Sequence, residues 1–343
     1  MSCSFILFAR FWGALVALLL VLGCQPALRP ELLPYFKTSG SDCSLQNQEL
    51  CVTFLGTSSL LFRDGSHSVL VDGYFSRPSL WQLLSGPIGS DPQVVKDTLK
   101  RLNLKQLDAL VVMHSHFDHA LDIATIAVET GALILGSEST AQIAIGSGVP
   151  SSQIKIAQTG QRYHFGAFTV VLEPSQHMPL GPLAEWLGMS GKIEAPLQQP
   201  SPFWAYREGQ TYAVIVQHPQ GNSLLHGIEV LPHEANGSYR FDTVFLTTPG
   251  LNRLSPEQHR RYFETLILKT QARRIVPVHW DDFTLPLSEA LQPLPRMIED
   301  LEQALKRLEQ QTKPYPDLKI ELWPAWEAFK PRPASSDTPP FSQ

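Results

Sequence analysis

The chain has 343 residues, of which 43% are hydrophobic, and it carries a formal net charge of −5. That length and hydrophobic content allow a sizeable buried core, in one large domain with appendages or in two smaller domains. The negative charge and the lack of a Lys/Arg-rich run interleaved with aromatic residues argue against nucleic acid as a partner.

Residues 1–23 predict a secretory signal peptide. An uncharged apolar run at residues 11–22 follows Arg10 and ends at Gly23. This is the layout of an export signal rather than of a long membrane-spanning helix. An uncleaved membrane anchor and plain soluble secretion remain as alternatives.

The end of that run resembles a bacterial lipobox, in which a cysteine is lipidated and becomes the first residue of the mature protein. The residues that carry the resemblance are Val21-Leu22-Gly23-Cys24. We therefore expect lipidation at Cys24 and attachment of the protein to the bacterial cell envelope through a lipid anchor. Gln25 stands where an Asp would signal inner-membrane retention, so the expected location is the outer membrane, facing the periplasm.

Residues 24–48 predict a lipidated tether that lifts the following domain, placed at residues 49–315, off the membrane. Once the signal peptide is removed and Cys24 carries lipid, Cys43 and Cys51 remain as a pair in an oxidising compartment. Two interpretations stay open. The pair forms a disulfide that closes a short loop before the first strand, or Cys51 packs as a small apolar residue and both thiols stay separate.

Short β-branched runs alternate with helical stretches from residue 50 to about residue 175, as expected of an α/β fold. Helices are predicted at residues 92–102 and 120–130. Residues 133–136 predict a strand, and residues 168–172 predict a later one.

The most informative segment follows an apolar run at residues 110–113. It places three imidazoles and one carboxylate within six residues, in the string His114-Ser115-His116-Phe117-Asp118-His119. These groups are ligands that Zn²⁺, Mn²⁺ and iron accept, and a loop leaving a strand end aims alternate side chains at neighbouring points. One loop is therefore predicted to supply two metals. Ordinary loop histidines do not explain the cluster, because packing gives no reason to gather costly polar groups there.

This H-x-H-x-D-H string resembles the signature of the metallo-β-lactamase superfamily, which consists mainly of metal-dependent hydrolases. Residues 51–62 and 68–75 look like the opening hairpin of that fold, with Asp72 at the end of its second strand, and residues 276–280 are similar to its final histidine segment. The resemblance covers about residues 50–285 and implies an α/β four-layer αββα sandwich. It is closest to the subgroup of ascorbate-6-phosphate lactonase and N-acyl-phosphatidylethanolamine phospholipase D.

Carried over residue by residue, the resemblance implies two groups of metal ligands. The first metal would be bound by His114, His116 and His177, and the second by Asp118, His119 and His279. The implied cofactor is one or two Zn²⁺ ions, with Mn²⁺ or iron also compatible. Asp281 and Asp282 flank His279, and they are expected either to orient it or to form a solvated acidic loop.

One ligand that the resemblance implies is missing. The superfamily usually supplies a bridging Asp after a Gly at the end of a strand, and here Ile228 occupies that position. Three interpretations stay open: Glu229 or His226 replaces it, the site holds a single metal, or the chemistry is lost. Glu229 would face away from the side of Ile228 unless a bulge intervenes. His226 shares that side, but an imidazole does not bridge two cations as a carboxylate does.

Residues 178–210 interrupt the pattern with prolines and aromatic residues, and they predict an insertion after the strand that leads to His177. The insertion either walls the active site or is a plain excursion packed by its own prolines. Further along, residues 255–269 and 297–311 predict two helices, and residues 331–343 predict a disordered tail.

The implied activity is metal-assisted hydrolysis of an ester, lactone, amide or phosphodiester by a metal-bound hydroxide. Asp118 would orient the attacking water or take its proton, in addition to its role as a ligand. We expect a small-molecule or lipid-like substrate at the cell envelope. The alternatives are a lipid-anchored metal-binding or scaffold protein that has lost turnover because of Ile228, and an iron oxygenase.

Overall fold

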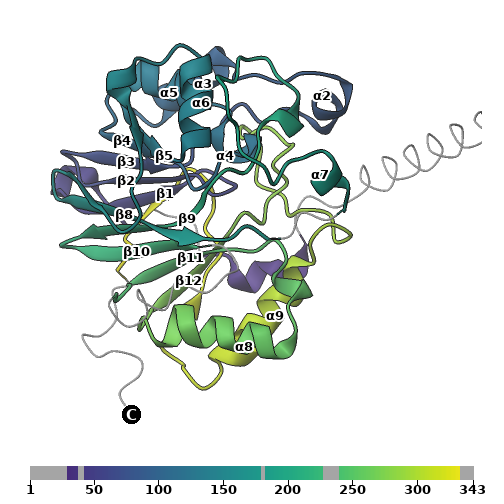
Figure 1. Cartoon of the computed structure of the whole chain (residues 1–343). Helices are drawn as coiled ribbons and strands as arrows, with labels where there is room; N and C mark the ends of the chain where they lie inside the picture. The colour runs from purple at the N-terminus through teal and green to yellow at the C-terminus, as the bar shows by residue number, and fades with distance from the viewer. Residues whose placement is uncertain (1–28, 38–41, 179–181, 227–238, 333–343) are drawn as a thin grey trace, which may run out of the picture.

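The computed structural model describes residues 29–37, 42–178, 182–226 and 239–332. These residues form two seven-stranded β-sheets that pack face to face (Figure 1). In spatial order the first sheet contains β14 (Ala328–Phe329), β1 (Cys51–Phe54), β2 (Leu60–Arg63), β3 (Ser68–Val71), β4 (Ala109–Val111), β5 (Leu133–Gly136) and β6 (Ile154–Ile156). The second contains β13 (Lys319–Ile320), β12 (Arg274–Val278), β11 (Thr243–Thr247), β10 (Gly221–His226), β9 (Thr211–His218), β8 (Phe168–Ser175) and β7 (Arg162–Phe165).

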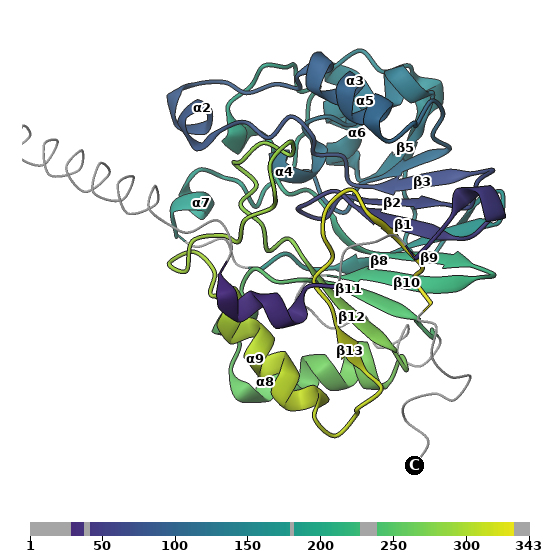
Figure 2. The same ribbon diagram turned by 180° about the vertical axis from the view of Figure 1, so that it is seen from behind.

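Helices lie on the outer side of each sheet, which gives four layers (Figures 1 and 2). Beside the first sheet lie α2 (Leu80–Ser85), α3 (Pro92–Arg101), α4 (Phe117–Ala120), α5 (Ile123–Thr130) and α6 (Glu138–Gly146). Beside the second lie α8 (Pro256–Phe263), which continues as a π-helix to Leu268, and α9 (Leu301–Thr312). A further short helix, α7 (Pro182–Trp186), lies at one end of the sandwich. The predicted α/β four-layer αββα sandwich is confirmed.

Each sheet is antiparallel in one half and parallel in the other. Strands β14, β1, β2 and β3 pair antiparallel, while β3, β4, β5 and β6 pair parallel. The second sheet repeats this layout from β7 to β13. The parallel strands β4 and β12 are buried throughout, because a helix layer covers one face and the other sheet covers the opposite face. Phe62 and Phe245 meet edge to face between the sheets, with ring centroids 6.1 Å apart.

The opening of the fold contains three strands rather than the predicted hairpin. Gly56 and Thr57 both have positive φ, +80° and 49°, and they turn the chain sharply inside the apolar run that begins at Cys51. The run is thereby divided into β1 and β2, which pair antiparallel. Asp72 consequently follows the third strand, β3, and not the second.

Two helix boundaries also differ from those predicted. The helix expected at residues 120–130 is divided into α4 and α5 at Asp122, whose carboxylate accepts hydrogen bonds from the backbone N–H groups of Phe75 and Ser76, at 2.7 and 2.8 Å. The helix expected to begin at Met297 begins at Leu301, because the Asp300 side chain caps it.

The predicted signal peptide, with Cys24, lies outside the described residues. Residues 29–37 contact the domain: Leu32 is fully buried, and the Arg29 guanidinium forms a buried ion pair with Glu302 of α9, 2.9 Å away. The limits of the tether and of the domain remain predictions, and so does the disordered tail, of which residues 333–343 are not described. Across the described ranges, we find no helix with the length and apolarity needed to cross a bilayer.

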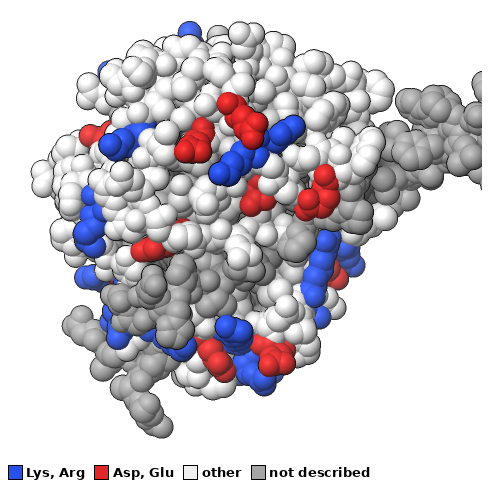
Figure 3. Space-filling model, in the orientation of Figure 1, with Lys and Arg blue, Asp and Glu red and all other residues white. Residues whose placement is uncertain are grey.

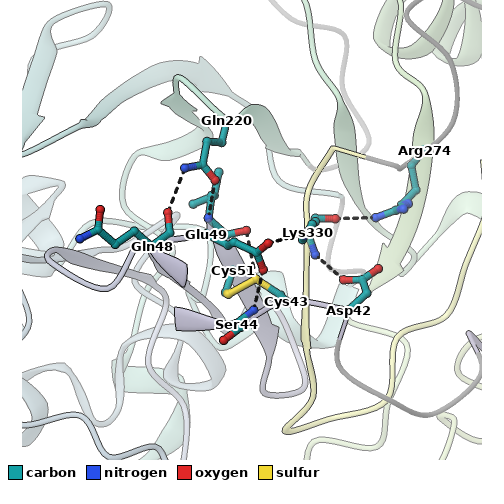
Figure 4. The surroundings of a disulfide bond; sticks show 10 residues. Asp42, Cys43, Ser44, Gln48, Glu49, Cys51, Gln220, Arg274 and Lys330 are labelled. Carbon is teal, nitrogen blue, oxygen red and sulfur yellow. Dashed lines mark hydrogen bonds and ion pairs between the residues drawn. A yellow bond between two sulfur atoms is a disulfide. The ribbon is translucent and has the colours of Figure 1, made fainter. Parts of the chain in front are cut away.

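Cys43 and Cys51 form a disulfide just before and at the start of β1 (Figure 4). The loop that it closes is fastened to two other parts of the chain. The backbone N–H of Lys330 donates to the Asp42 carboxylate at 2.7 Å. The side-chain amide of Gln220, between β9 and β10, bonds two backbone groups just before β1, at 2.8 and 2.9 Å. The disulfide therefore fixes a junction between the first strand, the last strand and the second sheet.

Replacing both Cys43 and Cys51 with Ala is expected to lower the free energy of unfolding by about 2–3 kcal/mol, because the short loop between them is no longer closed in the unfolded chain. Denaturant unfolding with and without a reductant measures this difference. The reductant should lower the midpoint of the wild type and leave that of the double variant unchanged. An equal response of both proteins would contradict the expectation.

The Arg29–Glu302 pair predicts a specific pH dependence of stability. Burial raises the pKa of Glu302, but hydrogen bonds from Arg296 and Arg29 outweigh that effect and lower it from 4.5 to about 2. The pair therefore stabilises the fold fully above pH 4.5, and this contribution is lost as the pH falls from 4.5 towards 2. Glu302→Gln is expected to be less stable than the wild type by about 2 kcal/mol at pH 7, with a difference that shrinks steadily below pH 4.5. Urea unfolding at pH 7, 4 and 3 tests this; a constant difference would refute it.

Candidate metal centre

The six predicted ligands come from loops at the ends of three strands. His114 and His116 follow β4, and Asp118 and His119 lie in the short helix α4 directly after them. His177 comes two residues after β8, and His279 directly follows β12. Strands from both sheets thus end at one place, and the side chains that follow them point into a common site.

The structure brings all six side chains together in the two predicted groups. The first group is His114, His116 and His177, and the second is Asp118, His119 and His279; within each, the potential ligand atoms lie within 4.8 Å of one another. In the second group the Nε2 atom of His279 lies 3.1 Å from Asp118 Oδ2 and 3.3 Å from His119 Nε2. Ligand atoms on one tetrahedral Zn²⁺ lie about 3.3 Å apart. The spacing of this group therefore suits a single cation.

The two groups are adjacent. The rings of His114 and His119, one from each group, have centroids only 3.9 Å apart. In the first group the ring centroids of His116 and His177 lie 4.8 Å apart, and those of His114 and His177 lie 4.7 Å apart. The two groups thus form one continuous cluster of side chains rather than two separate ones.

Unsatisfied nitrogen atoms show that these residues fit a metal. Both ring nitrogens of His114 are buried and have no hydrogen-bond partner among the described residues, and the same holds for Nδ1 of His279. A buried polar atom without a partner costs free energy, and native structures contain few of them. A cation bound to one ring nitrogen of His114 would remove part of that cost, whereas an ordinary hydrogen-bonded loop histidine would show its partner.

Electrostatics keep the donors in the form that a metal needs. Burial lowers the pKa of His114 well below its ordinary value, lowers that of His116 to about 3 and lowers that of His177, so these imidazoles are neutral at pH 7. Burial raises the pKa of Asp118, but the charges of His119 and His279 outweigh it and hold the pKa below its usual range. The first group therefore presents neutral nitrogens, and Asp118 provides an anion to the second group.

Asp72 fixes the orientation of His119. Its Oδ2 atom lies 2.6 Å from His119 Nδ1 and accepts a hydrogen bond from Ser58, also at 2.6 Å, while Oδ1 accepts one from the backbone N–H of Met113 at 2.8 Å. Nε2 of His119 is thereby turned towards the second group. Burial lowers the pKa of His119, but the Asp72 and Asp118 carboxylates outweigh it and raise the pKa. The sequence placed Asp72 at a strand end without revealing this contact, 47 residues along the chain.

His279 is held in a strained backbone conformation. Its φ is 60°, a value that a residue with a Cβ rarely adopts, and its backbone N–H donates to the carbonyl of Thr57 at 2.6 Å. The backbone N–H of Thr57 in turn donates to Asp281 at 2.7 Å, and Asp281 forms an ion pair with Arg77, also at 2.7 Å. A side chain at Gly56 would overlap the Arg77 guanidinium, so only glycine fits there.

The expectation of a solvated acidic loop is wrong for Asp281, which is fully buried. Asp281 orients the histidine indirectly, through the Thr57 turn. Asp282 is only partly buried, and its carboxylate accepts hydrogen bonds from the backbone and hydroxyl of Thr284. The sequence did not reveal the role of Arg77. This residue follows β3, and no local pattern there indicates that it pairs with Asp281, more than 200 residues further along the chain.

The position of the missing bridging Asp lies outside the described residues. Strand β10 ends at His226, which is buried, and Ile228 and Glu229 belong to the undescribed segment 227–238. Whether Glu229 or His226 replaces the bridging carboxylate therefore remains open.

A cavity of about 260 Å³ opens above the ligands. Apart from the ligands its lining is mostly apolar, and it includes Phe117, Met178, Met189, Phe283, Leu294 and Ile298. Met178 and Met189 belong to the insertion predicted at residues 178–210, so part of that insertion walls the site. The backbone N–H of Ser115 donates to the carbonyl of Glu208 at 2.9 Å, which joins the end of the insertion to the ligand loop. Neither Trp186 nor Trp204 lines the cavity.

Residues 52–182 match the family model described as Metallo-beta-lactamase superfamily. This part of the chain is therefore similar to the metallo-β-lactamase superfamily. It contains five of the six predicted ligands, and only His279 lies beyond it.

A relative from Agrobacterium fabrum, described as a metal-dependent hydrolase, is 26% identical over 126 residues. The aligned segment is 37% of this chain and 47% of that relative, so the chain covers about half of its length. Among solved structures, a metallo hydrolase from the archaeon Ignicoccus hospitalis is 17% identical, with a TM-score of 0.45 over 83% of this chain and 96% of that one. The metallo-beta-lactamase fold protein YhfI from Bacillus subtilis is 15% identical, with a TM-score of 0.46 over 80% and 95%.

Arg77→Met is expected to weaken metal binding by the second group, because it leaves the buried Asp281 carboxylate unpaired and releases the Thr57 turn that holds His279. Elemental analysis after dialysis should find less metal per chain, and thermal unfolding should occur at a lower temperature. Arg101→Met is the matched control, since Arg101 stacks on Trp326 at the surface and should leave the metal content unchanged. Full metal content in Arg77→Met would show that the ion pair does not position His279.

Proposed function

We propose that the protein is a metal-dependent hydrolase. The observation that carries this proposal is the convergence of six ligating side chains at the floor of an open cavity, with both nitrogens of His114 left without a partner among the described residues. A scaffold without chemistry has no physical need for buried, unpartnered imidazoles at the base of a cavity. The match of residues 52–182 to the metallo-β-lactamase superfamily model, and the similarity to a relative described as a metal-dependent hydrolase, support the same reaction class.

The proposed roles follow from the geometry. His114, His116 and His177 would hold one cation, and Asp118, His119 and His279 a second. A bound cation supplies a Lewis acid and lowers the pKa of water. The anionic Asp118 carboxylate, 3.1 Å from His279, is placed to orient a water molecule or to hold a proton, in addition to its role as a ligand.

We propose Zn²⁺ as the cofactor, because a set of five imidazoles and one carboxylate suits it. Mn²⁺ and iron accept the same donors, and a redox-active iron would support the oxygenase alternative. The substrate class is an ester, lactone, amide or phosphodiester with an apolar portion, since the cavity walls above the ligands are apolar. We also propose that the protein is related to the subgroup of ascorbate-6-phosphate lactonase and N-acyl-phosphatidylethanolamine phospholipase D.

We also propose that the protein acts at the bacterial cell envelope, held by a lipid on Cys24. The Cys43–Cys51 disulfide supports an oxidising compartment, because such bonds persist mainly outside the cytosol. We do not expect the protein to bind nucleic acid. On the face shown in Figure 3, Lys/Arg and Asp/Glu side chains are interspersed, without a continuous basic stripe that would follow a phosphate backbone.

A metal-binding protein without turnover is the second candidate. The observation that favours it is Ile228, at the position where the superfamily usually supplies a bridging carboxylate. Without that carboxylate the site has less negative charge to offset two divalent cations. A metal-binding protein without turnover is therefore expected to hold one metal per chain.

Metal content per chain tests the proposal directly. The wild type is expected to bind two equivalents of Zn²⁺, and His114→Ala and His279→Ala are each expected to lose one. His164→Ala is the matched control, because His164 is an exposed histidine on β7 away from both groups and should retain both equivalents. Elemental analysis after dialysis, together with a screen of chromogenic esters, lactones, amides and phosphodiesters, provides the measurement.

The outcomes separate the candidates. Two equivalents together with turnover that both variants lose support the hydrolase. One equivalent that only His114→Ala abolishes, without turnover of any ester, indicates the binding protein. A protein that binds no metal refutes both.

A further inference from the structure

The apolar lining of the cavity continues to the outside of the molecule. Ile298 lines the cavity and is nevertheless 50% exposed, and its neighbour Met297 is 66% exposed. On the insertion, Trp186 is 80% exposed at the end of α7. Met189, which lines the cavity, follows this helix closely, and its backbone N–H donates to the carbonyl of Ala184 in α7 at 3.1 Å. We refer to Trp186, Met297 and Ile298 as the apolar rim.

A single exposed apolar side chain needs no explanation, but three large ones on the two segments that also contribute Ile298 and Met189 to the wall of an apolar cavity do. Tryptophan in particular is enriched where protein meets the interface of a lipid bilayer. None of the described residues that line the cavity is Lys or Arg. The interior therefore favours an uncharged, apolar portion of a substrate over an anionic portion.

The N-terminal segment joins the domain beside this rim. The Arg29 guanidinium donates to the backbone carbonyl of Leu294, which lines the cavity, at 2.8 Å, and it pairs with Glu302 at 2.9 Å. Arg29 is only 4% exposed, so the chain is firmly attached at this point. The predicted lipid site, Cys24, precedes it by only five residues.

That short separation limits how the domain sits on a membrane. Since residues 29–37 pack on the domain, only residues 24–28 remain as a tether, and five extended residues reach roughly 18 Å. A lipid on Cys24, or the apolar run at residues 11–22 before it, therefore holds the Leu294 side of the domain close to the bilayer. Helices α3 and α5 lie on the other side of the sandwich from α9 (Figure 2).

We infer that the apolar rim rests in the lipid bilayer to which the N-terminus is attached, and that the cavity opens towards that bilayer. This inference rests on the proposed envelope attachment and extends the proposed hydrolase: the substrate would be a membrane lipid whose apolar chain passes from the bilayer along the rim into the cavity. The rim contributes binding to the membrane, and the six ligands lie at the inner end of the same path.

Photo-crosslinking of the full chain, isolated from membranes and reconstituted in phosphatidylcholine vesicles, tests the inference. Benzoylphenylalanine is introduced at Met297, at Trp186 and, as the matched control, at Val128, which is 59% exposed on α5 in the outer helix layer. The expected result is a lipid adduct from positions 297 and 186, several-fold above that from position 128. The measurement needs no turnover, so it stays informative even if the proposed hydrolysis fails.

Three results would overturn the inference. Equal lipid labelling at all three positions would show that the domain has no fixed orientation on the membrane. Adducts that map to residues 1–28 of the same chain would show that the rim is covered by the chain itself, and a crosslinked dimer would show that a second copy covers it. Elemental analysis of the three labelled proteins keeps the metal centre separate from this question, because none of the substituted residues is a ligand.

Discussion

Removing several imidazoles and a carboxylate from water within a few ångströms of one another costs free energy that apolar packing does not return. In this protein burial lowers the pKa of His114, His116 and His177. Ring nitrogens of His114 and His279 have no hydrogen-bond partner among the described residues. The pKa of Asp118 is held below its usual range, so its carboxylate stays anionic among them. A positive charge at the centre of this arrangement would offset that cost. The fold around the site is the means by which the protein keeps these groups together despite that cost.

The surrounding structure supplies rigidity in two ways. Asp72 and Ser58, from the loops beside β2 and β3, fix the ring of His119 through short hydrogen bonds. The buried Arg77–Asp281 pair holds the Thr57 turn, which in turn keeps His279 at a positive φ. Strain of this kind persists only where neighbouring contacts determine the backbone more strongly than its own preference does. Both devices act on the second group of ligands.

Much of the fold was accessible from the sequence because the signals were local. Strand β5 appears as an apolar run of four residues, α3 has an Asp cap and a proline in its first turn, and the ligand loop gathers its donors within six residues. The resemblance to a superfamily added His177 and His279, which lie far along the chain.

The remaining features depend on contacts between distant residues. Asp72 meets His119, and Arg77 meets Asp281, across 47 and 204 residues respectively, and no periodicity encodes such pairs. The turn at Gly56 and Thr57 lay inside a run that propensity alone assigns to one strand. Residues 29–37 have the composition of a tether, and only the burial of Leu32 and Arg29 shows that they are part of the domain.

The short strand β14 has a consequence for how copies of the chain behave towards one another. It contributes only Ala328 and Phe329, yet it pairs with Val52 and Thr53 along the outer side of β1, where the first sheet would otherwise end. Without it, β1 would present a row of unpaired backbone N–H and C=O groups along its edge, which is a template for pairing with another chain. These two residues therefore cover an edge through which copies of the chain would otherwise be able to pair.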